Sequence, residues 1–232
     1  YIISGLIAAT SLFGQVELLS PRFDFTPGIR YDRSISSPKD YLGYELGTEY
    51  TIYADVLSYL RTLDEQSDRV SIHPYGKTHE GRALEYLVIT SEKNQKRLDD
   101  IQKNNQRLAD PRNINPAVAK KIIRENPGIY WLSYNVHGNE ASSTEAVMQV
   151  AYRLAAGRDK ETKAILDNSV VILVPCINPD GRDRYVYWYK SAQSHVTNAD
   201  QFDYEHDEPW PGGRTNHYWF DLNRDWVWLV HP

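Results

Sequence analysis

The chain has 232 residues, 41% hydrophobic and 25% charged, a globular composition that argues against disorder. Its 26 Lys and Arg residues against 31 Asp and Glu residues give a formal net charge of -5, so no basic surplus points to a nucleic-acid backbone or an anionic membrane. The single cysteine, Cys176, excludes an intrachain disulfide and a cysteine-rich zinc site, so any metal must be held by His, Asp or Glu.

The N-terminal residues contain an apolar run, 2–13, that has the length of a signal-peptide core and is too short to span a bilayer. We interpret residues 1–14 as the remnant of a signal peptide, which predicts a secreted or periplasmic protein; a buried N-terminal segment is the alternative. Residues 15–50 read as an irregular lead-in segment. No other run is long and apolar enough for a transmembrane helix, so we expect no stable membrane span.

From residue 51 the apolar residues recur at helical spacing, which predicts an amphipathic helix capped by Thr48 or Thr51. Two strand-like runs follow, 70–75 and 84–89, separated by a glycine-containing polar loop. This arrangement predicts a hairpin. The polar stretch 91–125, broken at two prolines, is expected to form helical or loop cover rather than core.

The next segments alternate between strand and helix patterns. A strand at 129–136 precedes a helix whose apolar face spans 146–154, and the apolar run 170–177 is typical of a strand covered on both faces. The predicted fold class is therefore α/β, with a mixed, largely parallel, twisted sheet and helices on both faces. The aromatic-rich region 185–228 shows neither period, and we interpret it as a packed loop system.

Polar residues follow two of these strands. His137 and Glu140 come after the first strand, and an imidazole and a carboxylate at this spacing can both bind one zinc ion. Gly138 between them allows unusual backbone angles. The alternative is that Glu140 only stabilises a helix N-terminus and His137 is a polar residue at a strand end.

The second strand delivers Cys176 and then the turn sequence 178–181, Asn-Pro-Asp-Gly. Cys176 could be a nucleophile, but its apolar surroundings favour a packed, unreactive thiol. Further on, the adjacent Asn223 and Arg224 suit a carboxylate, because a guanidinium offers two charge-assisted hydrogen bonds and an amide adds another donor. The alternative for Arg224 is an ion pair with Asp225.

Together these residues resemble the carboxypeptidase A-like zinc metallocarboxypeptidases. In that family a His-x-x-Glu pair, an Asn-Pro-Asp-Gly turn and an Asn-Arg pair occur in this order, and the segment 76–82 is also similar. The resemblance covers about residues 51–228 and implies that residues 51–232 are the N-terminal part of a zinc carboxypeptidase-like catalytic domain, incomplete at the C-terminus.

The resemblance implies a role for each matched residue. His137 and Glu140 would bind the single catalytic Zn²⁺, and Asn223 and Arg224 would hold the free C-terminal carboxylate of a peptide substrate. The family also uses an arginine to polarise the scissile carbonyl. Arg214 is our candidate because flanking glycines would let it approach the site; the competing arginines are Arg182 and Arg184.

The third zinc ligand, the general base and a substrate-capping tyrosine of the family come later than these motifs, so we expect them outside this chain. His231 follows Asn223 too closely to be the third ligand. Two other functions stay open. One is a zinc-dependent amidohydrolase acting on N-acyl amino acids or cell-wall peptides, and the other is a non-catalytic binding module of the same fold. The sequence does not indicate the oligomeric state.

Overall fold

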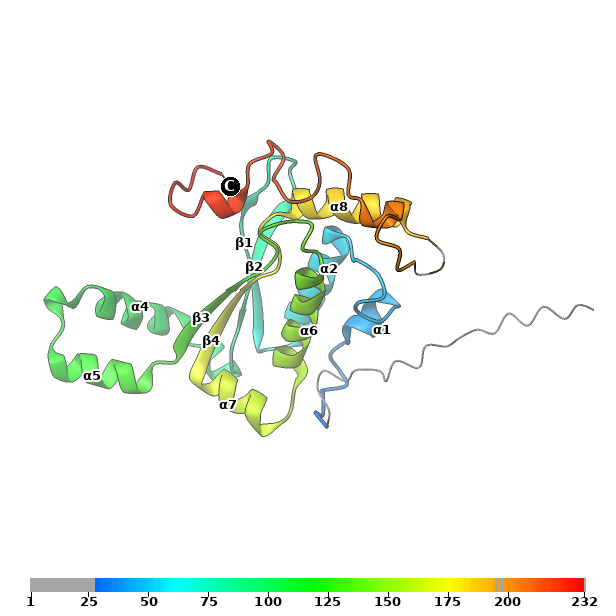
Figure 1. Cartoon of the computed structure of the whole chain (residues 1–232). Helices are drawn as coiled ribbons and strands as arrows, with labels where there is room; N and C mark the ends of the chain where they lie inside the picture. Colours follow the sequence, from blue (N-terminus) through cyan, green and yellow to red (C-terminus); the bar gives the residue numbers. More distant parts are fainter. Residues whose placement is uncertain (1–27, 195, 197, 232) are drawn as a thin grey trace, which may run out of the picture.

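The computed structural model describes residues 28–194, 196 and 198–231. The predicted signal-peptide remnant and the first part of the lead-in therefore lie outside the described residues. The described strands form one sheet in the order β1-β2-β4-β3 (Figure 1). Their bounds are β1 (Val70–Lys77), β2 (Ala83–Ile89), β3 (Gly128–Ser133) and β4 (Ser169–Val174).

The sheet is mixed, as expected. Strands β1 and β2 pair antiparallel with Val70 opposite Ile89, which confirms the predicted hairpin. Strand β4 then pairs antiparallel with β2 and parallel with β3. The described sheet is thus less parallel than expected, because β3 and β4 form its one parallel pair.

One face of the sheet is covered by α2 (Tyr53–Gln66) and α6 (Ser142–Ala156). Their apolar residues recur at helical spacing and form the main core with residues of β2 and β4. Fully buried members of this core are Val56, Tyr59, Leu60, Leu63, Leu87, Ile89, Val147, Met148, Ala151 and Leu173. Both helices were predicted from the sequence. Figure 1 shows them side by side over the strands, with the short α1 (Pro38–Leu42) outside them.

The predicted threonine cap of α2 is wrong. The residue at the cap position is Ile52, which forms no side-chain capping bond. Thr51 instead donates its N–H and its hydroxyl to the carboxylate of Glu145, at 2.7 and 2.8 Å. The N–H of Tyr53 is accepted by Asp183 Oδ1 at 2.9 Å. A residue distant in sequence therefore supplies the cap, which local sequence could not reveal.

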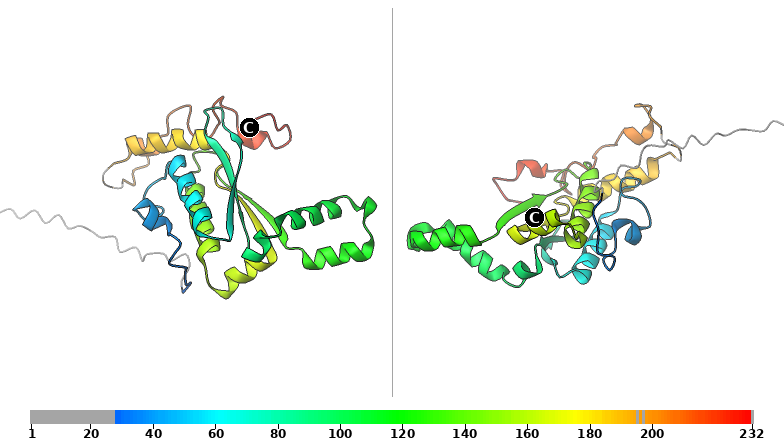
Figure 2. Two further views of the ribbon diagram at one scale, coloured as in Figure 1. Left: turned by 180° about the vertical axis from the view of Figure 1, so that it is seen from behind. Right: turned by 90° about the horizontal axis from the view of Figure 1, so that it is seen from below.

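The opposite face is covered in part by the segment 91–125. It folds into α3 (Glu92–Gln95), α4 (Leu98–Ala109), a short 3₁₀ helix (Pro111–Asn113) and α5 (Pro116–Glu125). Leu98 and Ile101 at the start of α4 pack against Val88 and Val170 of the sheet. Beyond that contact, α4 and α5 extend away from the sheet as an arm (Figures 1 and 2). The segment is helical, as expected, but only its first part covers the sheet.

The region after β4 is less irregular than predicted. Helix α8 (Pro179–Ala192) occupies its first part, so the interpretation of 185–228 as loops throughout is wrong. Asn178 caps this helix by accepting from the N–H of Gly181 at 3.0 Å, and Pro179 stands in its first turn. Tyrosines and tryptophans are distributed around the helix, which hides the helical period in the sequence. Later helical turns are short, at Tyr204–His206 and Leu222–Arg224.

The carboxyl ends of β3 and β4 lie together, because these strands are parallel. The chain segments beyond them stay paired: Ile177 N–H donates to Tyr134 O at 3.0 Å and Asn178 N–H donates to Asn135 O at 3.2 Å. Helix α7 (Lys160–Asn168) leads back into β4 at the other end of the sheet (Figure 1). Within the part of the chain that is described, no helix is long and apolar enough to cross a membrane.

Candidate functional site

His137 and Glu140 lie close together in the loop after β3. Nδ1 of the imidazole is 2.9 Å from Glu140 Oε1, while Nε2 is 3.1 Å from Oδ1 of Asp221. His137 is buried and the Glu140 side chain is largely exposed. The imidazole therefore has one nitrogen directed to each carboxylate.

Asn135 holds this loop in shape. Its backbone is in the left-handed region, with φ of 55°, which asparagine tolerates better than most residues. Its amide Nδ2 donates to the carbonyls of His137 at 2.6 Å, Gly138 at 3.3 Å and Glu140 at 3.1 Å. Sequence reasoning did not assign a role to Asn135. The only sequence signal for it was a polar residue at the end of an apolar strand.

Gly138 is required for close packing and not for unusual backbone angles, which corrects the sequence interpretation, because it is not among the described glycines that have a positive φ. A Cβ on Gly138 would lie 2.1 Å from Arg182 N and 2.4 Å from Gly213 O. A Cβ on Gly181 would lie 2.3 Å from Gly213 O. Two loops and the first turn of α8 therefore meet backbone to backbone at Gly138, Gly213 and Gly181, which we call the glycine junction.

Asp221 contacts the imidazole of His137 on the side away from Glu140. Burial raises the pKa of Asp221, but hydrogen bonds from Asn223 N–H, Arg214 and His137 outweigh burial and hold this pKa below its ordinary value. The ionised carboxylate can only accept, so it favours the imidazole tautomer that carries its proton on Nε2 and directs the Nδ1 lone pair toward Glu140 and Arg214. Asp221 is a site residue that sequence reasoning missed.

In that tautomer His137 Nδ1 is an acceptor, as is the carboxylate of Glu140, and the two atoms face each other at 2.9 Å. Two acceptors in this position fit a cation between them. Two ligands of one tetrahedral zinc ion would be separated by roughly 3.3 Å, at zinc–ligand distances of about 2.0 to 2.1 Å. Within the described residues, no group of three or more His, Cys, Asp or Glu side chains could hold a metal ion. His137 and Glu140 therefore fit zinc as a two-donor arrangement.

Arg214 is the arginine that the structure brings to this pair. Its Nη1 lies 3.4 Å from His137 Nδ1, and its Nη2 donates to Asp221 Oδ2 at 3.0 Å. Arg182 is fully buried, and its guanidinium donates to Glu145 Oε1 at 2.6 Å. Arg184 donates to main-chain carbonyls, the nearest being Gly212 O at 2.7 Å. The geometry therefore favours Arg214 over its two competitors.

Asn223 and Arg224 follow Asp221 on a short 3₁₀ turn and are both exposed. Asn223 Oδ1 accepts from Trp226 Nε1 at 2.9 Å, and Arg224 Nη1 donates to the carbonyl of Asn223 at 3.2 Å. The carboxylate of Asp225 instead accepts the N–H groups of residues 230 and 231. The local ion pair considered for Arg224 is not formed in the described structure, so its guanidinium is open to solvent.

Two further residues of interest have other surroundings. The His231 ring packs on Phe220, with ring centroids 4.4 Å apart, and on His79 at 6.0 Å. Cys176 is buried, and burial raises the pKa of its thiol to about 12. Such a thiol is almost entirely protonated at neutral pH and is a poor nucleophile. The interpretation of Cys176 as a packed residue is confirmed.

The segment 76–82, at the end of β1 and before β2, is hydrogen-bonded to the Asn-Pro-Asp-Gly sequence, which forms the cap and first turn of α8. Thr78 Oγ1 donates to Asp180 Oδ1 at 2.7 Å. Arg82 donates to the same carboxylate at 2.7 Å and to Asp183 Oδ2 at 2.8 Å. These bonds connect β1, β2 and the start of α8 at the end of the sheet that carries His137.

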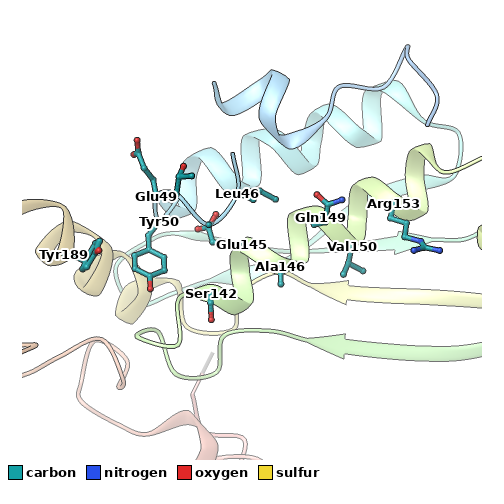
Figure 3. A pocket seen from close by; sticks show the side chains of 12 residues that line it. Leu46, Glu49, Tyr50, Ser142, Glu145, Ala146, Gln149, Val150, Arg153 and Tyr189 are labelled. Atoms are coloured by element: carbon teal, nitrogen blue, oxygen red, sulfur yellow. The ribbon is translucent and has the colours of Figure 1, made fainter. Parts of the chain in front are cut away.

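A cavity of about 540 Å³ lies beside α6, between the segment 46–50, residues of α6 and Tyr189 of α8 (Figure 3). None of His137, Glu140, Arg214 and Asp221 lines it. It borders Glu145, whose carboxylate is already engaged by Arg182 and Thr51. The cavity is therefore separate from the candidate site.

Comparison with known proteins gives one family and several solved structures. Residues 56–231 match the zinc carboxypeptidase family. Carboxypeptidase A from Helicoverpa armigera is 20% identical with a TM-score of 0.41, over 57% of this chain and 25% of that one. A metallo-carboxypeptidase from Burkholderia cenocepacia is 17% identical with a TM-score of 0.46, over 79% and 34%. Bovine thrombin-activatable fibrinolysis inhibitor, solved with a tick carboxypeptidase inhibitor, is 15% identical with a TM-score of 0.39, over 65% and 40%. The chain thus spans 25% to 40% of the length of these proteins.

Proposed function

The chain belongs to the zinc carboxypeptidase family, and from this premise we propose that it contributes the N-terminal part of a metallocarboxypeptidase that hydrolyses C-terminal peptide bonds. The observation that carries the proposal is the geometry of His137. Its Nδ1 faces Glu140 Oε1 at 2.9 Å while its Nε2 is held by Asp221 at 3.1 Å. An oriented imidazole and a neighbouring carboxylate would supply two of the three protein ligands that a catalytic zinc ion commonly has.

In this proposal His137 and Glu140 hold one zinc ion. A zinc ion bound there would supply Lewis-acid chemistry, polarising the scissile carbonyl and making a bound water more acidic. Arg214 would donate to the carbonyl oxygen as negative charge develops on it, a role supported by the position of its guanidinium beside His137. The exposed Asn223 and Arg224 would bind the terminal carboxylate of the peptide, and this contact would select the last peptide bond.

Residues 51–232 would then be the N-terminal part of the catalytic domain, with the third zinc ligand and the general base supplied by a later part of a longer protein. The family match over residues 56–231 supports this assignment. We also propose that the protein is exported, to the periplasm or outside the cell, on the basis of the apolar run at residues 2–13.

Zinc binding tests the metal site. The natural full-length protein that contains this chain is loaded with zinc, dialysed and assayed for bound metal. We expect one zinc ion per protein, and its loss in His137→Ala and in Glu140→Gln. His73→Ala is the matched control, since the His73 imidazole lies near Ser71 and Tyr86, away from the site. Stoichiometric zinc in the His137→Ala/Glu140→Gln double variant would rule out the assignment.

Peptidase activity tests the reaction. Matched peptides with a free and an amidated C-terminus are incubated with the zinc-loaded protein, with and without chelator. We expect chelator-sensitive release of the last residue only from the peptide with a free C-terminus. Arg224→Ala should raise KM for that peptide. Cleavage of N-acyl amino acids or cell-wall peptides in preference to these substrates would favour the amidohydrolase. Zinc binding without any hydrolysis would favour the binding module.

A further inference from the structure

We propose that Arg184 is a positioning residue that holds Arg214 beside His137 by binding the main chain on both sides of it. The proposal rests on the function proposed for Arg214. Arg184 lies near the start of α8, one turn after the Asn-Pro-Asp-Gly sequence, and the chain after α8 turns back along that helix (Figure 1).

The contacts of Arg184 bracket the candidate arginine. Its Nη1 donates to Gly212 O at 2.7 Å, two residues before Arg214. Its Nη2 donates to Asn216 O at 3.2 Å, two residues after Arg214, and lies 3.5 Å from Thr215 O. A planar guanidinium presents donors on both terminal nitrogens in a fixed geometry, which suits it to hold two ends of a turn at once.

Other contacts leave the loop little freedom once Arg184 holds it. Asn178 Nδ2 donates to the carbonyl of Arg214 itself at 3.1 Å. The carboxylate of Glu208 accepts from the N–H of Gly213 and, at 2.9 Å, from Asn139 Nδ2 in the His137 loop. Gly213 belongs to the glycine junction, where its carbonyl meets Gly138 and Gly181. The main chain at Arg214 is therefore fixed relative to the zinc ligands from two sides.

The Arg214 side chain itself is less constrained than its backbone. It is 47% exposed, and its described contacts are His137 and Asp221. A shift of the loop would therefore move the guanidinium away from the reacting carbonyl. Since a displacement of about 1 Å can cost about 100-fold in rate, loss of Arg184 should lower the rate by displacing the Arg214 guanidinium.

The first test measures the loop without using activity. Amide hydrogen exchange of the full-length protein is compared for the parent, Arg184→Ala and Arg69→Ala. Arg69 is a matched control, because it also donates to several carbonyls, Leu154, Ala155 and Gly157, at the far end of α6. We expect exchange at residues 212–216 to be at least about tenfold faster in Arg184→Ala and unchanged in Arg69→Ala. Unchanged exchange in Arg184→Ala would overturn the proposal.

The second test is a double-mutant cycle on turnover of a free-ended peptide. Arg184→Ala should lower kcat by roughly 10- to 100-fold with little change in KM, and should have almost no further effect in the Arg214→Ala background. An equal loss in both backgrounds would show that Arg184 acts elsewhere and would overturn the proposal. A parent protein without peptidase activity would refute the proposed function, while the exchange measurement would still decide whether Arg184 holds the loop.

Discussion

The imidazole Nε2 of His137 lies 3.1 Å from Oδ1 of Asp221, although 84 positions separate the two residues. The same carboxylate accepts from Arg214 through Oδ2 at 3.0 Å and from the N–H of Asn223 through Oδ1 at 2.9 Å. Asp221 therefore contacts a candidate zinc ligand, the candidate carbonyl-polarising arginine and the main chain of Asn223 in the candidate carboxylate-binding pair.

Replacement of Asp221 by Asn should weaken zinc binding by roughly 10- to 100-fold, because the imidazole loses the charged acceptor that keeps its proton on Nε2. The measurement is a competition titration against a coloured chelator. Asp225→Asn is the matched control, since Asp225 accepts only main-chain N–H groups in the described structure. Equal affinity in Asp221→Asn and the parent would contradict this role.

The sequence predicted the parts of the site that depend on neighbouring residues. His137 and Glu140 are three positions apart on one loop, so their spacing alone brings them together. Asp221 could not be recognised in this way, because its contact with His137 forms only after β3, β4 and the segment after α8 have packed. The same reason explains Asn135, whose three bonds to carbonyl groups depend on the final shape of the loop.

A similar limit applies to the fold. The periodic residues of α2 and α6 and the hairpin were readable because one face of each is buried. The direction in which β4 pairs with β2 could not be predicted, because Leu87 and Leu173 are equally apolar whichever way the strands run. Helix α8 was hidden because its aromatic residues, such as Tyr185 and Tyr187, are not confined to one face.

Gly138→Ala should destabilise the fold by at least about 3 kcal/mol, because the new methyl group would meet backbone atoms, which cannot rotate away. The nearest atoms would be Arg182 N at 2.1 Å and the carbonyl carbon of Gly181 at 2.2 Å. Urea denaturation gives the change in free energy of unfolding. Gly76→Ala is the control, since its nearest neighbour would be Leu84 Cδ1 at 4.0 Å. Similar losses in both variants would argue against the glycine junction.

Glu80 should make stability depend on pH in the acid range. Burial raises its pKa, but hydrogen bonds from Arg82 and His217 outweigh burial and keep the pKa below its ordinary value. A carboxyl with a depressed folded-state pKa stabilises the protein above its unfolded pKa of about 4.3, and this contribution is lost as pH falls through the folded pKa. Glu80→Gln should therefore be less stable than the parent at pH 7, and the difference should shrink below about pH 4. A difference that stays constant in denaturation series from pH 7 to pH 3 would contradict this linkage.

The buried pair of Arg182 and Glu145 should be essential to the fold while contributing no chemistry. Their side chains are 0% and 6% exposed, and Arg182 Nη2 donates to Glu145 Oε1 at 2.6 Å. Arg182→Met leaves the carboxylate without a cation in the protein interior, which should cost about 3 to 5 kcal/mol in urea denaturation. The double variant Arg182→Met/Glu145→Leu should recover part of that loss, because it removes the uncompensated charge as well. Lys39→Met breaks an exposed ion pair, with side chains 56% and 55% exposed, and should cost less than about 1 kcal/mol. An equally small loss in free energy of unfolding for Arg182→Met and Lys39→Met would contradict this prediction. It would show that the buried Glu145 carboxyl does not need the Arg182 guanidinium.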